Sequence, residues 1–164
     1  MKIKHFIITL LLLAGTQFSS NAQLSLGAGL GYGTDIEELA IRARGVYAIT
    51  GPWRAAADFD FYLDGEKNIS FWEFNVNGHY LFLNNEKLRA YALAGLNFYH
   101  VKIDYDSNIP GFENVSNTDT GLNLGAGLEV PIGPVDFFGE AKFSLAGSEQ
   151  LFIAAGVQFP LGSR

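Results

Sequence analysis

The stretch that decides the fold is GLNLGAGLEVPIGPVDFFGEAKFSLAG, residues 121–147, in which apolar residues occupy every second position on both sides of a Gly-Pro break. The residues between them, such as Asn123 and Glu129, are small or polar. A period of two is the spacing of a β-strand with two different faces, and the break favours a tight turn. This segment therefore predicts a hairpin whose faces meet different surroundings. Its first apolar face carries Leu122, Leu124, Ala126, Leu128 and Val130.

The same alternation recurs about eight times along the chain, which is typical of a β-sandwich or β-barrel. An even-numbered meander closes most readily into an up-and-down barrel, because closure removes both exposed edges. In the fifth segment the alternation fits either parity, so its faces stay unassigned, and a bulge near Gly95 would account for this. The strands are expected at residues 24–33, 39–49, 53–63, 70–82, 88–103, 121–130, 135–145 and 151–161.

The connections between these segments alternate in kind. Short connections rich in Gly, Pro or Asn, at residues 50–52, 84–87 and 131–134, are typical of tight hairpins. The connections at the other end are polar or charged, and we expect them to be exposed loops. These loops are expected at residues 34–38, 64–68, 104–119 and 147–150.

The first 22 residues have the pattern of a secretory signal. Lys2 and Lys4 precede an apolar run at residues 6–15, and Ser20-Asn21-Ala22 supplies the small residues that a signal peptidase reads. The run is about half of the ~20 residues that a spanning helix needs. We therefore expect cleavage before Gln23 and a single mature domain at residues 23–164.

Charge and cysteine content exclude some classes of protein. Removal of residues 1–22 leaves 9 basic and 17 acidic side chains, a net charge of −8. This balance argues against nucleic-acid binding, which depends on cations that neutralise phosphates. The chain has no Cys, so disulfides do not hold the domain together.

Two barrels with opposite faces fit the alternation. In a soluble lipocalin-like barrel in the periplasm the apolar face lines a ligand cavity, whereas in a membrane barrel the apolar face meets lipid. The polar face here is dominated by Gly, Ser, Asn and Ala with a few charges, unlike a water-facing surface rich in Lys and Glu. Small residues suit the narrow interior of an eight-stranded barrel. We therefore expect an all-β, eight-stranded antiparallel up-and-down transmembrane β-barrel, with the soluble barrel as the alternative.

Charged residues of the polar face are expected to pair inside the barrel. If Ile49 faces Trp53 across the turn, the same register places Arg44 opposite Asp58, and Arg42 opposite Asp60. Glu129 must then find a cation, for which we expect Lys142. Such a set is expected to form a structural plug, with a narrow conducting path as the alternative. The set comprises Arg42, Arg44, Asp58, Asp60, Glu129, Glu140 and Lys142.

Aromatic residues gather toward both ends of the strands, where the two interfacial belts of a membrane barrel would lie. The expected belt at the short-turn end comprises Tyr47, Trp53, Tyr80, Phe82 and Tyr91. The expected belt at the loop end comprises Tyr32, Phe61, Trp72 and Phe143.

Strands such as LSLGAGLGYG (24–33) and VDFFGEAKFSLAG (135–147), and turns such as TGPW (50–53), make the mature chain resemble the small eight-stranded outer-membrane β-barrel family. That family includes outer membrane protein X and the barrel of outer membrane protein A. The Asn-Ala-Gln cleavage site also looks like those of exported Bacteroidetes proteins. The resemblance implies a location in the outer membrane of a Gram-negative bacterium, contact with its lipid, and insertion by the barrel-insertion machinery. One departure is that members usually end on an aromatic residue, whereas Phe159 here precedes residues 160–164.

Other motifs have simpler explanations than catalysis or binding. Glycine recurs at every second position from 27 to 33, a spacing that differs from that of a nucleotide-binding loop and favours close strand packing. Residues 104–108 begin like a calcium loop, but Ile109 and Val115 stand where Gly and Glu are required.

The histidines do not form a recognisable catalytic or metal site in the sequence. A hydrogen bond to Asn77 would explain His79, and no His-Glu spacing supports a role for His100. A lipid-modifying enzyme would need a nearby nucleophile, but Ser70 is nine residues from His79, ~30 Å along a strand. We therefore expect no enzyme activity, cofactor or metal, and a structural or surface-contact role through the loops, above all 104–119, where a surface ligand would bind.

Overall fold

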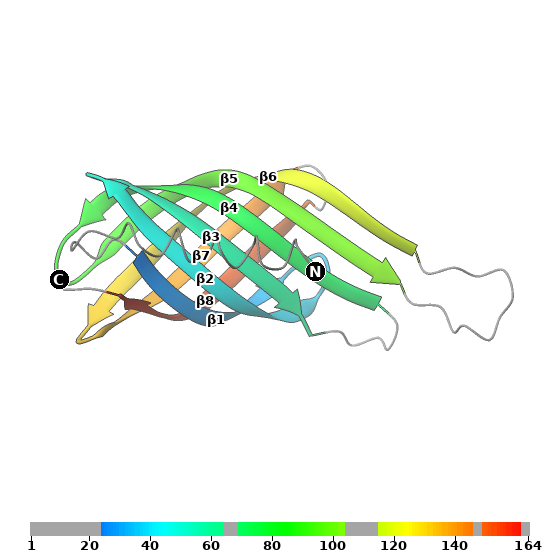
Figure 1. Ribbon diagram of the computed structural model, residues 1–164, viewed down its shortest axis with the longest axis horizontal. Coiled ribbons are helices and arrows are strands. Elements are labelled where there is room, and N and C mark those ends of the chain that lie inside the picture. The colour runs from blue at the N-terminus through cyan, green and yellow to red at the C-terminus, as the bar shows by residue number, and fades with distance from the viewer. Residues whose placement is uncertain (1–23, 64–68, 104–114, 146–148, 162–164) are drawn as a thin grey trace, which may run out of the picture.

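Eight antiparallel strands form a closed barrel in the computed structural model (Figure 1), which describes residues 24–63, 69–103, 115–145 and 149–161. Each strand pairs with its neighbour in sequence, and pairing of β1 with β8 closes the sheet. The expected up-and-down topology is therefore confirmed. Within the described residues, no helix is long and apolar enough to cross a membrane. The strands are β1 (Leu24–Gly33), β2 (Glu38–Thr50), β3 (Trp53–Tyr62), β4 (Ile69–Asn84), β5 (Arg89–Ile103), β6 (Val115–Ile132), β7 (Val135–Leu145) and β8 (Gln150–Pro160).

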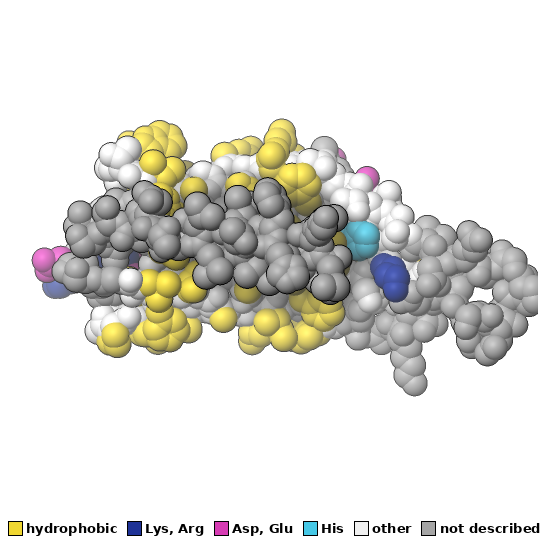
Figure 2. Space-filling model, viewed as in Figure 1, with side chains coloured by type: hydrophobic (Ala, Val, Ile, Leu, Met, Phe, Trp, Pro, Cys, Tyr) yellow, Lys and Arg dark blue, Asp and Glu magenta, His cyan; other side chains and the backbone are white. Residues whose placement is uncertain are grey.

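The apolar faces of the strands point outward and the polar faces point inward. Figure 2 shows hydrophobic side chains along the side of the barrel. Leu30 and Phe82 are 59% and 63% exposed, whereas Arg42 and Glu129 are fully buried. A soluble ligand-binding barrel would need the reverse arrangement, so that alternative is wrong. The observed arrangement, with apolar side chains outside and polar side chains inside, is the one that a lipid-facing barrel requires.

Tight turns join the strands at one end, as expected. Gly51 in the β2–β3 turn and Gly133 in the β6–β7 turn have φ values of 55° and 60°, which glycine adopts without steric cost. In the β4–β5 turn, the Asn85 side chain accepts hydrogen bonds from the backbone N–H groups of Lys87 and Leu88. This end of the barrel is called the short-turn end below, and the opposite end the loop end.

The register differs from expectation at two bulges. Thr50, not Ile49, pairs with Trp53, because the register shifts between Ala48 and Thr50. The shift lies in the last residues of β2, next to the turn, so from Ala48 inward the register is the same as the expected one.

The second bulge lies in β4, between Leu81 and Leu83, and not near Gly95 of β5 as expected. Gly95 pairs in regular register with Asn77. The faces of β5 follow, with Leu96 exposed on the outside and Asn97 buried inside.

Strands β4, β5 and β6 extend beyond the rest of the barrel at the loop end (Figure 1). β6 pairs with β5 from Val115 onward, but it pairs with β7 only from Leu122 onward. Residues 115–119 were expected in a loop and are instead strand, because they continue the β5 pairing. The rest of that expected loop, including the calcium-like residues 104–108, lies outside the described residues, as do residues 1–23, 64–68 and 146–148.

Candidate functional site

The interior of the barrel is filled by pairing small residues with large ones. A Cβ atom on Gly31 would lie 2.1 Å from Phe152 Cζ, and one on Gly127 would lie 2.3 Å from Tyr91 Cζ. On Gly29 it would lie 2.5 Å from the Ala155 carbonyl oxygen. The expected close packing of the Gly repeat is confirmed, and these glycines leave room for aromatic rings and neighbouring strands.

Two arginines share one carboxylate in the middle of the interior. Arg42 contacts both carboxylate oxygens of Asp60, through Nε at 2.7 Å and Nη2 at 2.9 Å, and its Nη1 lies 2.7 Å from Glu140 Oε1. Arg44 Nε lies 3.0 Å from Asp58 Oδ1, and Arg44 Nη2 donates to Glu140 Oε2. The expected register pairs, Arg42 with Asp60 and Arg44 with Asp58, are confirmed. Because all five groups are buried, each charge depends on its partners.

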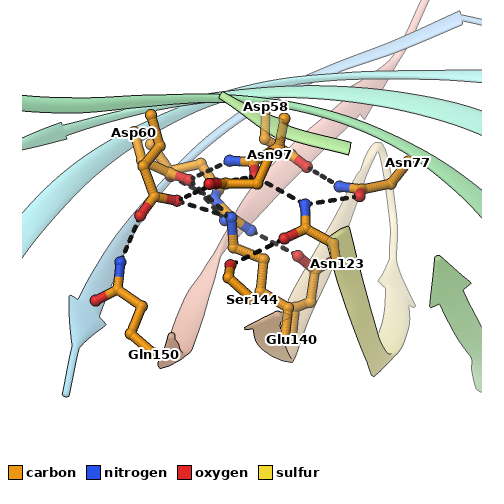
Figure 3. A network of polar contacts seen from close by, with 12 residues as sticks. Asp58, Asp60, Asn77, Asn97, Asn123, Glu140, Ser144 and Gln150 are labelled. Atoms are coloured by element: carbon orange, nitrogen blue, oxygen red, sulfur yellow. Dashed lines mark hydrogen bonds and ion pairs between the residues drawn. The ribbon is translucent and has the colours of Figure 1, made fainter. Parts of the chain in front are cut away.

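A layer of amides lies next to these ion pairs (Figure 3). Asn123 Nδ2 donates to the side-chain oxygens of Asn75 and Asn77 at 2.8 and 3.0 Å. Asn97 Nδ2 donates to Asn75 Oδ1 at 2.9 Å, and Ser144 Oγ donates to Asn123 Oδ1 at 3.0 Å. These contacts join β4, β5, β6 and β7 across the lumen, so the interior is a packed polar core.

The expected pairing of Glu129 with Lys142 is wrong. Lys142 Nζ lies 3.1 Å from Glu73 and 3.6 Å from Asp60, while Glu129 accepts a 2.8 Å hydrogen bond from Arg54 Nη1. The register explains the error, because Lys142 lies opposite Gly125, four residues from Glu129 along β6.

The residue directly opposite Glu129 is Arg89, whose Nη1 lies 3.6 Å from Glu129 and 2.8 Å from Asp136. Three of the residues involved, Arg54, Arg89 and Asp136, were not in the expected set, and neither was Glu73. The pairing of Arg89 with Glu129 could be found only once the faces of β5 were known.

The outer membrane protein β-barrel domain is the family whose sequence profile matches residues 6–145, which is more than half of the chain. The chain belongs to this family. A comparison of this chain with curated proteins found no match. Its barrel is therefore that of an outer-membrane β-barrel protein, of a kind that sits in the lipid bilayer.

Solved structures of other proteins share the fold at low sequence identity. The N-terminal β-barrel domain of Pseudomonas aeruginosa OprF is 17% identical, with a TM-score of 0.68 over 86% of this chain and 98% of that one. Ail, the attachment invasion locus protein of Yersinia pestis, is 18% identical, with a TM-score of 0.59 over 83% and 95% of the two chains. Neisserial surface protein A is 16% identical, with a TM-score of 0.59 over 84% and 94%.

The two strand histidines of this family member lie on opposite faces of the sheet. His79 is buried inside and stacks on Tyr91, with ring centroids 4.3 Å apart and planes 10° apart. The expected hydrogen bond to Asn77 is wrong, because neither ring nitrogen of His79 has a hydrogen-bond partner among the described residues. His100 stacks on Trp72, and its Nδ1 lies 2.7 Å from Thr118 Oγ1. In the described ranges, no three metal-binding side chains gather.

Most of the expected belt aromatics face outward. Trp53 and Tyr80 contact each other at the short-turn end, with ring centroids 4.9 Å apart, and Tyr47 and Phe82 are also exposed there. Tyr91 is an exception: it is fully buried, and its hydroxyl donates a 2.7 Å hydrogen bond to Glu140. Its assignment to a belt was therefore wrong, because the parity of β5 could not be assigned from the sequence.

Most of the expected loop-end belt also faces outward. Tyr32, Phe61 and Phe143 are exposed there, while Trp72 is half-buried between Phe59 and His100.

Proposed function

We propose that the protein is a structural and surface-contact protein of the Gram-negative outer membrane and that it has no catalytic activity. In this proposal the barrel is the anchor. The extension of β4, β5 and β6 at the loop end is the contact surface. Outer-membrane barrels place their short turns in the periplasm and their longer loops outside, which would direct the extension away from the cell.

The anchor role rests on the packed interior. The ion pairs and amides bind strands to one another through side chains, in addition to the backbone ladder. We propose that this set is a structural plug. The signal at residues 1–22, cleavage before Gln23 and use of the barrel-insertion machinery belong to the same proposal.

The observation that carries the contact role is a free strand edge. Residues 115–121 of β6 pair with β5 on one side, and no described strand pairs with their other side. Side chains at 116–120 are exposed, and they are small and polar. An unpaired edge of this kind can accept an extended segment of another protein through backbone hydrogen bonds.

Charge restricts the class of partner. Between positions 102 and 119 the sequence has one cation, Lys102, against Asp104, Asp106, Glu113 and Asp119. One solved structure of Ail holds a heparin analogue, sucrose octasulfate. The acidic sequence here disfavours a polyanion of that type, so we propose a neutral or basic protein segment as the partner.

Deletion of residues 109–118 tests the contact role, because it removes the start of β6 together with residues before it. Cells that display the protein are compared with cells that display the deletion variant for adhesion to immobilised extracellular-matrix proteins and to heparin. Barrel folding is checked by the gel shift between unheated and boiled samples. We expect adhesion to matrix proteins to fall to background while the gel shift persists. Unchanged adhesion by a folded deletion variant would contradict the proposal.

Two proline substitutions separate the edge from general damage. Adjacent residues of a strand direct their N–H groups to opposite sides, so Ser116→Pro and Asn117→Pro remove one N–H from the β5 pairing and one from the free edge. Only the variant that alters the free edge should lose adhesion without loosening the β5 pairing, as measured by amide hydrogen exchange. Equal adhesion by both variants and the wild type would count against strand addition.

A further inference from the structure

The free edge of β6 has a sequence that is complementary to itself. The edge covers residues 115–121 and reads VSNTDTG, with Thr118 at its centre. Figure 1 shows this part of β6 beside β5, where the sheet extends past β7. If the edges of two copies pair in antiparallel direction about a two-fold axis at Thr118, every residue of each edge has a partner.

On the inner face of the edge, this register places Asn117 of each copy opposite Asp119 of the other. Within one chain, Asn117 Nδ2 donates a 2.9 Å hydrogen bond to Asp119 Oδ2, and both residues are exposed. An amide nitrogen has two hydrogens and a carboxylate accepts several bonds, so each Asn117 can also donate to the partner's Asp119. Opposite side chains have Cβ atoms about 4.5–5.5 Å apart, which permits this contact. The two copies would therefore form a closed ring of amide–carboxylate bonds.

On the outer face, the same register places hydroxyl groups opposite one another. Thr118 lies opposite itself, and Ser116 lies opposite Thr120 on both sides of the axis. Thr and Ser side chains on opposing strands form favourable hydrogen-bonded pairs. All three residues are exposed, and Thr118 Oγ1 lies 2.7 Å from His100 Nδ1 of β5, which restricts its rotamer.

Neighbouring registers fit less well. Opposing residues of an antiparallel pair direct their backbone groups alike, so the two-fold axis can move only from one residue to the next. With the axis at Asp119, two carboxylates lie directly opposite each other, which is destabilising. With the axis at Asn117, the amide–carboxylate pairs are lost. The register that pairs the complete edge is therefore also the one that suits its side chains.

Strand direction determines how the two barrels face each other. β6 runs from the loop end to the short-turn end, so antiparallel pairing of two β6 edges makes the loop ends overlap and directs the short-turn ends apart. Barrels side by side in one membrane have β6 strands that run the same way and cannot pair like this. Residues 115–121 give an overlap of about 24 Å at about 3.4 Å per residue. The pairing therefore joins barrels of two facing membranes.

The charge of the extension permits contact between copies. Residues 98–103 and 115–121 contain one Lys, Lys102, and one acidic residue, Asp119, so a second copy is a neutral partner for this edge. The whole chain has a net charge of −6, so two copies repel at longer range. Salt screens this repulsion and should strengthen the contact, whereas it would weaken the contact with a basic partner.

We propose that the free edge of β6 binds the same edge of a second copy on a facing membrane, so that the protein joins cells that both carry it. This inference rests on the contact role proposed above and names a partner for the same edge.

Cysteine cross-linking tests the register, because the chain has no cysteine of its own. Thr118→Cys places one thiol at the two-fold axis, with the two Cα atoms about 4.5–5.5 Å apart, which a disulfide can span. Ser116→Cys is the matched control, because its two thiols would be about 14 Å apart along the strands. Two cell populations whose proteins carry different tags are mixed and treated with a mild oxidant.

We expect Thr118→Cys to give a disulfide-linked dimer that contains both tags, and Ser116→Cys to give none. A mixture of Ser116→Cys cells with Thr120→Cys cells should give the dimer again, because these two residues lie opposite each other. This mixture also keeps the test independent of whether Thr118→Cys folds. The gel shift between unheated and boiled samples checks the folding of each variant.

Exchange of charges between copies is the second test. Asn117→Asp places two carboxylates opposite each other, so cells that all carry it should clump no more than cells without the protein. Asp119→Asn cells should join Asn117→Asp cells in mixed clumps, because each Asp then faces an Asn again. The clumps are counted by microscopy with a different fluorescent label for each population.

Absence of the Thr118→Cys dimer, an equal amount of dimer from Ser116→Cys, or clumps that need the protein on only one population would each overturn the proposal. If adhesion to matrix proteins still depends on residues 109–118 in that case, the contact role stands and only the second copy is the wrong partner. If deletion of these residues changes neither adhesion nor clumping, the contact role itself is wrong.

Discussion

Removal of the Glu140 carboxylate is the most direct test of the packed interior. Glu140 accepts hydrogen bonds from Arg42, Arg44 and Tyr91, and its residue is only 4% exposed. Glu140→Ala would leave all three donors inside the barrel without this acceptor. Water cannot replace the carboxylate without entering the packed region between the strands.

The expected loss of stability follows from the contacts that each donor residue retains. Arg42 keeps both contacts with Asp60, and Arg44 keeps Asp58, so neither guanidinium becomes an isolated charge. The cost is therefore less than the sum of three charged hydrogen bonds at about 1.5–3 kcal/mol each. Loss of one partner from a buried ion pair typically costs about 3–5 kcal/mol, and we expect about 4 kcal/mol for Glu140→Ala.

The assay is urea unfolding of the barrel in lipid vesicles, with the folded fraction measured by gel mobility of unheated samples. With a denaturant slope of about 2 kcal/mol per M, a loss of about 4 kcal/mol lowers the urea midpoint by roughly 2 M. Glu140→Gln keeps one acceptor oxygen and should show a smaller loss. Glu86→Ala, in an exposed turn, should stay within about 0.5 kcal/mol of the wild type.

The order of the three variants decides the outcome. If Glu140→Ala and Glu86→Ala unfold at the same urea concentration, the buried contacts of Glu140 contribute nothing net, and the reasoning about the plug is wrong. If Glu140→Gln is as unstable as Glu140→Ala, the negative charge is the important property of this side chain, because Gln keeps the shape of Glu and one acceptor oxygen.

Three further predictions address the membrane face, the lumen and export. Leu124→Arg, in the middle of β6, should lower the free energy of unfolding in vesicles by about 2–4 kcal/mol, whereas Ile132→Arg at the turn should lower it by about 0–1 kcal/mol. The two residues are similarly exposed, at 52% and 55%, so the difference would come from their depth in the bilayer. Equal costs would contradict an outward lipid face. Planar bilayers that contain the purified barrel should show no sustained current steps, because the described interior is packed; regular steps would show that the plug opens. Mass spectrometry of the protein from outer membranes should give a chain that begins at Gln23, and retention of residues 1–22 would refute the signal assignment.

The barrel and its inverted polarity could be predicted because they depend on a period of two, which the sequence displays directly. The pairing of Arg42 with Asp60 could also be predicted, since a short turn joins their strands and sets the register. The bulge at Ile49 was not predicted, but it lies at the end of β2 next to the turn and does not change the inner pairs. Local information was therefore sufficient for the pairs between β2 and β3, where a tight turn connects two strands with clear faces.

Contacts between strands distant in sequence could not be predicted. Glu129 is paired by Arg54 and approached by Arg89, which lie on β3 and β5, whereas the sequence suggested Lys142 on the adjacent strand. Finding these partners requires the parity of β5, which the Leu81 to Leu83 bulge obscures, and the curvature that brings β3 close to β6 across the lumen. Neither the parity of β5 nor the curvature of the barrel can be read from the alternation of a single strand.

The distribution of satisfied and unsatisfied groups along the lumen makes its two ends unequal. Toward the loop end, Asn75, Asn97 and Asn123 bridge several strands and leave few donors without acceptors. Toward the short-turn end, Arg54 has two donor atoms without a described acceptor beside a cavity. These donor atoms are themselves buried, so a solute that enters from either end must displace side chains before it gains a hydrogen bond. The free edge of β6 at the loop end can instead be reached by a partner without such a displacement, so contact with proteins is favoured there.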